Sequence, residues 1–218
     1  MNKETKIGVI TLIVIIALIG IALVAIKSYN NKHLEDAIET TWGQEYYKYL
    51  TKNLMDQDTK DKIKTYTVDF YKIEDLDNPI MVVEYEYEGD SYSNIYYIKG
   101  DEIKFINSED PTTVDLLYNK ETKKQEYYTI VTNKQGDYYE DIKTQIHNAD
   151  LDPEDKNRIP STGHLFSEKI PEFPKFDEVF KRVKVDREDI KLTRKSSDKD
   201  IQQAVIKKIK EYKKTNNA

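Results

Sequence analysis

The chain has 218 residues, of which 40 are acidic and 34 basic, and it contains no cysteine. The absence of cysteine excludes disulfides, thiol nucleophiles, thiolate metal sites and the lipid-bearing cysteine of a lipoprotein. The net charge of −6 disfavours a nucleic-acid partner for the main body, because an acidic surface repels phosphates.

The first predicted element is a membrane anchor. The run from Ile7 to Ile26 contains no charged residue, and a helix of about 20 residues spans roughly 30 Å, the thickness of a bilayer's hydrocarbon core. A cleaved signal peptide has a shorter apolar region that ends in a small-x-small site, which this run lacks. The sequence therefore predicts an uncleaved signal anchor over residues 7–27, with residues 1–6 as a cytoplasmic tail; cleavage is the alternative.

The orientation of this anchor follows from size more than from charge. Lys3 and Lys6 precede the apolar run, and Lys27, Lys32 and His33 follow it, so the positive charges on the two sides nearly balance. Long polar domains are exported largely regardless of their charge. We therefore expect a single-pass protein of the cell membrane whose body lies outside the cytoplasm.

Residues 28–55 are predicted to form an amphipathic helix, because their apolar side chains recur at spacings of three and four residues. Asn30–Asn31 and Gly43 are the expected places for a break, since these residues are poor helix formers. The apolar stripe consists of Leu34, Ala37, Ile38, Trp42, Tyr46, Tyr49, Leu50 and Leu54.

A series of short strands is predicted next, in segments rich in β-branched and aromatic residues and separated by turn residues. Residues 83–88 alternate strictly between apolar and acidic side chains, which indicates one packed and one wet face. The predicted strands are 66–73, 80–88, 94–99, 102–107, 114–118, 125–132 and 138–145. Together they predict an α+β domain over residues 28–146, in which a helix packs on an antiparallel meander of about six or seven strands with one solvated face.

Residues 147–174 read as an irregular linker, because the periodicity gives way to polar residues and prolines. Residues 175–218 are predicted to be a helical C-terminal part. It comprises a short amphipathic helix around Phe176, an edge strand over residues 190–193, and a helix over residues 197–214 that Ser197 or Asp198 caps.

Three groups of residues are candidates for a functional site. Asp150 to Asp155 begins like a calcium loop, but Asp155 and Ser161 stand where such a loop needs glycine and glutamate, and a short turn starting at Asp152-Pro153 explains the pattern better. His33, His147 and His164 show no metal spacing, and no glycine-flanked nucleophile turn supports a grouping of Ser161 with His164. The sequence therefore predicts no catalytic, cofactor or metal residue.

The third group is the set of lysines on the last predicted helix: Lys207, Lys208, Lys210, Lys213 and Lys214. Such a cluster suits anionic lipid headgroups or wall polymers. Lysines also complement the negative end of a helix dipole, which is the simpler interpretation.

Two resemblances bear on the family. Trp42-Gly-x-x-Tyr46-Tyr47-x-x-Leu50, followed by a strand and Asp75-Leu76-Asp77, resembles a group of small anchored or secreted Gram-positive proteins of unassigned role, over about residues 40–145. The resemblance implies an α+β body with tyrosine-rich hairpins. Thr11-Leu12-Ile13 and its apolar continuation are similar to type IV pilins, although Ile13 stands where those proteins place a glutamate.

These observations predict a non-catalytic binding or scaffold protein of the cell envelope. It would contact the membrane through residues 7–27 and a protein or wall-polymer partner through its tyrosine-lined sheet or its basic C-terminal helix. One alternative is a hydrolase that cuts wall glycan with paired carboxylates, which need a separation of about 5–10 Å. Asp69, Glu84 and Asp115 lie on predicted strands, but nothing in the sequence distinguishes them from other acidic residues. The other alternative is a pilin-like assembly subunit.

Overall fold

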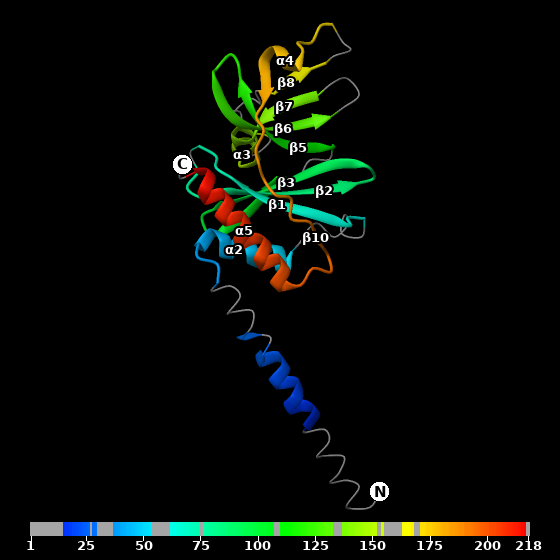
Figure 1. Ribbon diagram of the computed structural model, residues 1–218, viewed down its shortest axis with the longest axis vertical. Helices are drawn as coiled ribbons and strands as arrows, with labels where there is room; N and C mark the ends of the chain where they lie inside the picture. The colour runs from blue at the N-terminus through cyan, green and yellow to red at the C-terminus, as the bar shows by residue number, and fades with distance from the viewer. Residues whose placement is uncertain are drawn as a thin grey trace, which may run out of the picture.

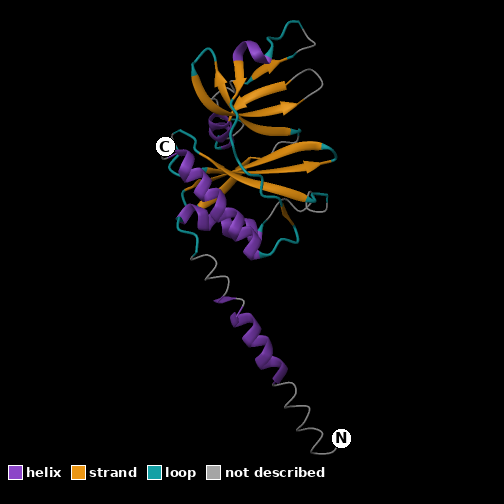
Figure 2. Cartoon of the chain, in the orientation of Figure 1, coloured by secondary structure: helices purple, strands orange, loops and turns teal. Residues whose placement is uncertain are grey.

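Two antiparallel sheets of five strands each form the body of the protein, as the computed structural model shows (Figures 1 and 2). The structure describes residues 15–26, 28–29, 37–53, 62–74, 76–106, 110–132, 137–151, 154, 163–167 and 171–216. The predicted α+β class with antiparallel pairing is confirmed, but a single meander is wrong, because the strands divide between two sheets.

The first sheet has the order β10-β1-β2-β3-β4, and the second has the order β8-β7-β6-β5-β9. The first sheet comprises β1 (Thr65–Tyr71), β2 (Ile80–Tyr87), β3 (Asp90–Lys99), β4 (Glu102–Ile106) and β10 (Leu192–Thr193). The second comprises β5 (Thr112–Asn119), β6 (Lys124–Thr132), β7 (Asp137–Asp141), β8 (His164–Phe166) and β9 (Phe180–Arg182). The predicted meander is therefore correct for consecutive strands within each sheet, while the last three strands come from segments far along the chain.

Helices α2 (Thr41–Lys52) and α5 (Asp198–Asn216) pack together on the first sheet (Figure 1). Tyr46 is buried between the helix and the sheet, and its hydroxyl donates to the carbonyl of Pro79 over 2.9 Å. Trp42 lies between the sheet and α5, with its ring 5.1 Å from Phe70 and 5.7 Å from Tyr212. The amphipathic pattern that predicts both helices therefore also identifies the faces that they bury.

The start of α2 differs from the prediction. Residues 37–40 are not helical, so the predicted helix over residues 28–55 is wrong there, while residues 30–36 and 54–61 lie outside the described residues. Gly43 is no break but lies buried inside α2. A Cβ atom on Gly43 would meet the side chains of Ile209 and Thr40 at 2.6 Å, so this glycine permits the close approach of α5.

Gly43→Ala is therefore expected to lower the free energy of unfolding by about 1–3 kcal/mol, because the added methyl group overpacks the contact between α2 and α5. Urea denaturation followed by circular dichroism measures the loss. Glu45→Ala, at an exposed position of the same helix, is the control and should change stability by less than about 0.5 kcal/mol. An alanine variant as stable as the wild type would show that the helices separate without cost.

Helix α3 (Ile142–Ala149) follows directly on β7, so the predicted strand 138–145 is wrong from Ile142 onward. The Asp141 carboxylate accepts a hydrogen bond of 2.6 Å from the backbone N–H of Thr144 and caps the helix. Ile142 and Ile146 are both buried, one helical turn apart. A capping aspartate followed by this spacing is the signal that distinguishes the helix from a strand.

The predicted irregular linker over residues 147–174 contains a strand, because β8 pairs with β7. The C-terminal part is also less helical than predicted. α4 (Phe176–Val179) is one short turn, and β9 then pairs with β5. The predicted edge strand is confirmed as β10, and the last helix is confirmed as α5, where the Ser197 hydroxyl accepts from the backbone N–H of Asp200 over 3.2 Å.

Residues 183–191, which we call the strap, lead in extended form from β9 in the second sheet to β10 in the first (Figure 1). The backbone N–H of Val183 donates to the carbonyl of Leu116 at the start of the strap. The strap thereby crosses the region where the two sheets meet.

A separate helix precedes the body. Residues 15–26 are helical and project away from both sheets (Figure 1). Within the described part of the chain, no helix is both long and apolar enough to cross a membrane. The predicted anchor over residues 7–27 lies partly outside the described residues, which exclude residues 1–14 and 27.

Candidate functional site

The helix of residues 15–26 exposes its apolar side chains. Ile15, Ile16, Leu18, Ile19, Ile21, Leu23, Val24 and Ile26 are between 48% and 70% exposed. A helix that is apolar on every side is not stable against water and needs an apolar environment. This surface is the first candidate for an interaction site.

A second candidate is the aromatic surface of the first sheet. Tyr85 and Tyr92 stack across β2 and β3 with ring centroids 5.6 Å apart, and Tyr87 meets Tyr92 edge-on at 5.9 Å. On β4, at the edge of the sheet, Phe105 is 55% exposed and lies 6.1 Å from the ring of Tyr96. Tyr85 and Tyr96 are buried in the core. Tyr87 and Tyr92 are half-buried and, with Phe105, offer apolar ring faces to a partner.

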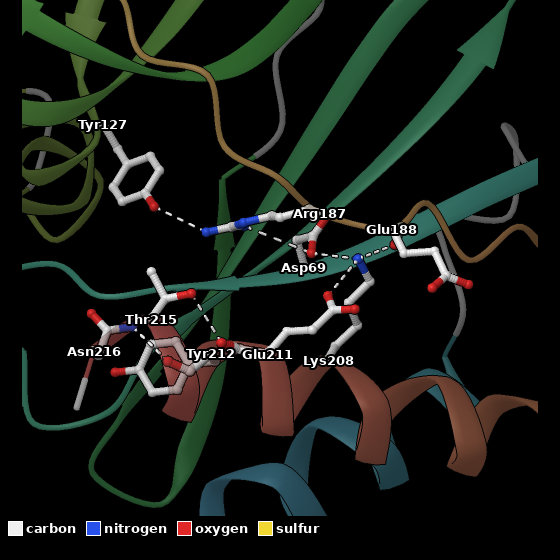
Figure 3. Close-up of polar contacts among 9 residues, drawn as sticks. All are labelled: Asp69, Tyr127, Arg187, Glu188, Lys208, Glu211, Tyr212, Thr215 and Asn216. Carbon is white, nitrogen blue, oxygen red and sulfur yellow. Dashed lines mark hydrogen bonds and ion pairs between the residues drawn. The ribbon is translucent and has the colours of Figure 1, made fainter. Parts of the chain in front are cut away.

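The third candidate is a buried group of charged side chains where the two sheets, the strap and α5 meet (Figure 3). We call it the junction cluster, and it consists of Asp69, Arg187, Lys208 and Glu211 with the adjoining rings of Tyr71 and Tyr127. Lys208 projects from α5, and its side chain is only 1% exposed. Its ammonium group lies 2.9 Å from Asp69 on β1 and 3.2 Å from Glu211 on α5, and it donates to the backbone carbonyl of Glu188 in the strap. One cation thus joins the helix, the first sheet and the strap.

Arg187 in the strap joins the same cluster to the second sheet (Figure 3). Its guanidinium lies 4.2 Å above the ring of Tyr71 on β1 and donates to the Tyr127 hydroxyl on β6 over 3.0 Å. The rings of Tyr71 and Tyr127 are themselves 4.4 Å apart, and Asp69 lies 3.7 Å from the guanidinium. A planar, delocalised cation suits this combination of a ring face and oxygen acceptors.

Two carboxyl groups near the junction cluster, those of Asp69 and Glu84, have raised pKa values. Burial raises the pKa of Asp69, although Lys208 and Arg187 oppose this shift. Burial also raises the pKa of Glu84 to about 7, and the neighbouring charge of Asp69 adds to the effect. Raised carboxyl pKa values occur at catalytic sites and at structural ion-pair networks alike.

The geometry of the cluster favours the structural interpretation. Its charged groups form ion pairs with one another, as the contacts of Lys208 and Arg187 show, and they also contact the strap. A cleft of about 380 Å³ lies nearby between both sheets, but Tyr127 is the one member of the cluster that reaches it. Its lining residues are Lys72, Ile73, Glu74, Gln125, Glu126, Tyr127, Asp141, Lys143 and Asn216. Glu74, Glu126 and Asp141 are the acidic residues among those that line the cleft.

Of the acidic residues that resemble a calcium loop, the structure describes Asp150 and Glu154. Asp150 is bound elsewhere, since its carboxylate accepts from the Tyr97 hydroxyl and pairs with Lys99, both at 2.9 Å. Asp152 and Asp155 lie outside the described residues. In the portion of the chain that is described, no three His, Cys, Asp or Glu side chains are grouped to hold a metal ion.

Two of the three histidines lie among the described residues. His147 lies in the last turn of α3, His164 is on β8, and His33 and Ser161 lie outside the described residues. Of the lysines on α5, Lys208 is buried, Lys207 pairs with Glu188 and Lys213 pairs with Glu39. The structure therefore uses much of the predicted basic surface for contacts within the molecule.

Comparisons of the chain with protein-family models, with curated proteins and with solved structures give no match.

Proposed function

We propose that the protein is a single-pass, membrane-anchored scaffold that presents a non-catalytic binding domain outside the cytoplasm. The observation that carries the proposal is the exposed apolar helix of residues 15–26. Its side chains are uncharged on every face, and the uncharged run extends back to Ile7 in the sequence. A bilayer is the environment that such a surface fits best.

The body supports a binding role more than a catalytic one. The carboxylate of Asp69 and the cations of Arg187 and Lys208 pair with one another and hold β1, the strap and α5 together. The aromatic surface on β2, β3 and β4 is the feature most open to a partner, with Phe105 at its edge. A protein or a cell-wall polymer fits this surface, because both offer apolar faces and hydrogen-bonding groups.

Membrane association is tested by expressing the full chain and washing the membranes with alkaline carbonate. We expect the wild-type protein to stay in the membrane pellet. The double variant Leu18→Asp/Leu23→Asp should move to the soluble fraction, because each charge costs about 3 kcal/mol inside a bilayer. Phe105→Asp, which places the same charge at an exposed apolar position of the body, is the control and should remain in the pellet.

Orientation is tested on intact, wall-stripped cells by adding a protease from outside. Digestion of the body with survival of a small membrane-bound fragment is the expected result. Release of the wild-type chain by carbonate would overturn the anchor. A pelleted chain that resists the protease until the cells are lysed would keep the anchor and reverse the orientation.

A further inference from the structure

Positively charged side chains gather at one end of the second sheet. Lys120 and Lys123 lie in the turn between β5 and β6, and Lys124 begins β6. On the neighbouring edge strand β9, Lys181 pairs with Tyr118 of β5, next to that turn. We call this surface the basic end, and its exposed members are Lys120, Lys123, Lys124, Lys181 and Arg182.

Two of these cations are held at the rim of a hollow of about 410 Å³. The Lys120 ammonium group donates to the backbone carbonyl of Asp177 in α4. The Arg182 guanidinium pairs with Asp115 on β5 and lies 5.3 Å from the ring centre of Phe176. Both cations have more donors than these contacts use, so they can also donate to a ligand. Because they are already fixed, they lose little conformational freedom on binding, and the hollow therefore suits an anionic group.

The basic end is an exception on an acidic molecule. Residues 115–124 and 175–184 carry seven basic and four acidic side chains, whereas the whole chain has a net charge of −6. An anionic partner is therefore attracted to this end and repelled by the rest of the surface. Such charge complementarity determines where a partner docks and in which orientation.

The basic end lies far from the predicted anchor. Figure 1 shows α4 and the second sheet at the end of the body opposite to the helix of residues 15–26. In an anchored chain this end faces away from the membrane, and the attraction to lipid headgroups is screened beyond about 10 Å. The placement therefore favours an anionic polymer of the cell wall over the headgroups of the membrane that holds the chain.

We propose that the basic end binds a linear polymer of the cell wall that carries repeating phosphate or carboxylate groups. One anionic group fits the hollow between Lys120 and Arg182, and the next groups along the polymer meet the exposed lysines of the β5–β6 turn and of β9. Contacts that are weak one by one add up along a single polymer chain. The choice of a wall polymer rests on the proposed function, because it requires the body to lie outside the cytoplasm, whereas the choice of a polyanion rests on the basic end alone.

Binding is tested with the full chain in a neutral detergent, using fluorescently labelled inorganic polyphosphate and polyglutamate as probes. We expect binding that weakens as the salt concentration rises, and no binding of a neutral dextran. Binding of one of the two polyanions alone would also support the proposal and would identify the anionic group.

The triple variant Lys123→Gln/Lys124→Gln/Lys181→Gln should weaken binding at least about tenfold, because three contacts between an ammonium group and an anion are lost. The three lysines are exposed, so the variant should fold as the wild type does, which circular dichroism checks.

The triple variant Lys199→Gln/Lys210→Gln/Lys214→Gln is the matched control. It removes the same number of charges from exposed positions on α5, the other lysine-rich surface, and should keep the wild-type affinity. Equal weakening by both triple variants, or a wild-type chain that binds neither polyanion, would overturn the proposal. Binding of water-soluble, short-chain phosphatidylglycerol without binding of the polymers would assign the basic end to lipid headgroups and would also overturn it.

The carbonate wash and this binding measurement can fail separately. A chain that stays in the washed membrane pellet but binds neither polyanion would reject the polymer site alone. A chain that carbonate releases, but that binds the polyanions through the basic end, would reject the proposed function and leave the basic end as a polyanion site.

Discussion

Lys208→Met is expected to lower the free energy of unfolding by about 3–5 kcal/mol at pH 7, the usual cost of leaving a buried charge without its partner. The variant keeps the length of the side chain but removes the ammonium group from Asp69, Glu211 and the strap carbonyl. Urea denaturation measures the loss. The loss should shrink as the pH falls and Asp69, whose pKa burial raises, takes up a proton.

Lys207→Met is the matched control for this experiment. Lys207 is the adjacent lysine on α5, but it is half exposed and pairs with Glu188 at the surface. Its replacement should cost less than about 1 kcal/mol, as is usual for exposed ion pairs. The double variant Asp69→Asn/Lys208→Met should recover part of the loss, because both charges are then absent. Equal effects of the two single lysine variants would contradict the role of Lys208.

The local elements of this fold are largely encoded in local patterns. The strands β1 to β6 coincide with the predicted ones within a few residues, because alternation and turn residues define them. The helix α5 follows from its apolar stripe and its cap at Ser197. The division into two sheets has no such signal, since β4 and β5 follow one another in the chain but belong to different sheets. The strands β8, β9 and β10 also escape prediction, because they are two or three residues long and pair over long distances.

The junction cluster was not predictable for a related reason. Asp69 and Glu84 are two of 40 acidic residues, and their spacing resembles that of ordinary solvent-facing positions on strands. What buries them is the strap, which brings Arg187 from more than a hundred residues away. Lys208 offered one clue, because it lies on the apolar side of α5 between Val205 and Ile209. A charged residue at such a position indicates a buried partner.

The high tyrosine content predicts a kind of surface but not the role of each tyrosine. Tyrosine outnumbers phenylalanine by 17 to 6, which agrees with the prediction of a tyrosine-lined sheet. Tyr87 and Tyr92 lie half-buried on a face of the first sheet, and Tyr85 beside them is buried in the core. Tyr71 and Tyr127 have another role, because their rings meet between the sheets beneath Arg187. Composition predicts the kind of surface, whereas the pairing of sheets decides which tyrosines become internal contacts.

Arg187→Met is expected to lower the free energy of unfolding by about 2–4 kcal/mol and to uncouple the two sheets. Arg187 is the side chain that contacts Tyr71 and Asp69 on the first sheet and Tyr127 on the second. Without it, Asp69 keeps one of its two cations, and the strap keeps the contacts of Glu188 with Lys207 and Lys208. The loss should therefore be smaller than that of Lys208→Met but should affect both sheets.

Two probes of urea unfolding distinguish uncoupling from simple destabilisation. Fluorescence of Trp42, the one tryptophan of the chain, reports on the first sheet and its helices, whereas far-ultraviolet circular dichroism reports on both sheets. The two transitions should coincide in the wild type and separate in Arg187→Met, because a single cooperative unit requires the junction. Arg187→Lys keeps the charge but lacks the planar group over Tyr71, so it should lie between the two. Coincident transitions in all three proteins would mean that the sheets are coupled by the line of bonds from Ser93 to Thr112, with Arg187 contributing only stability.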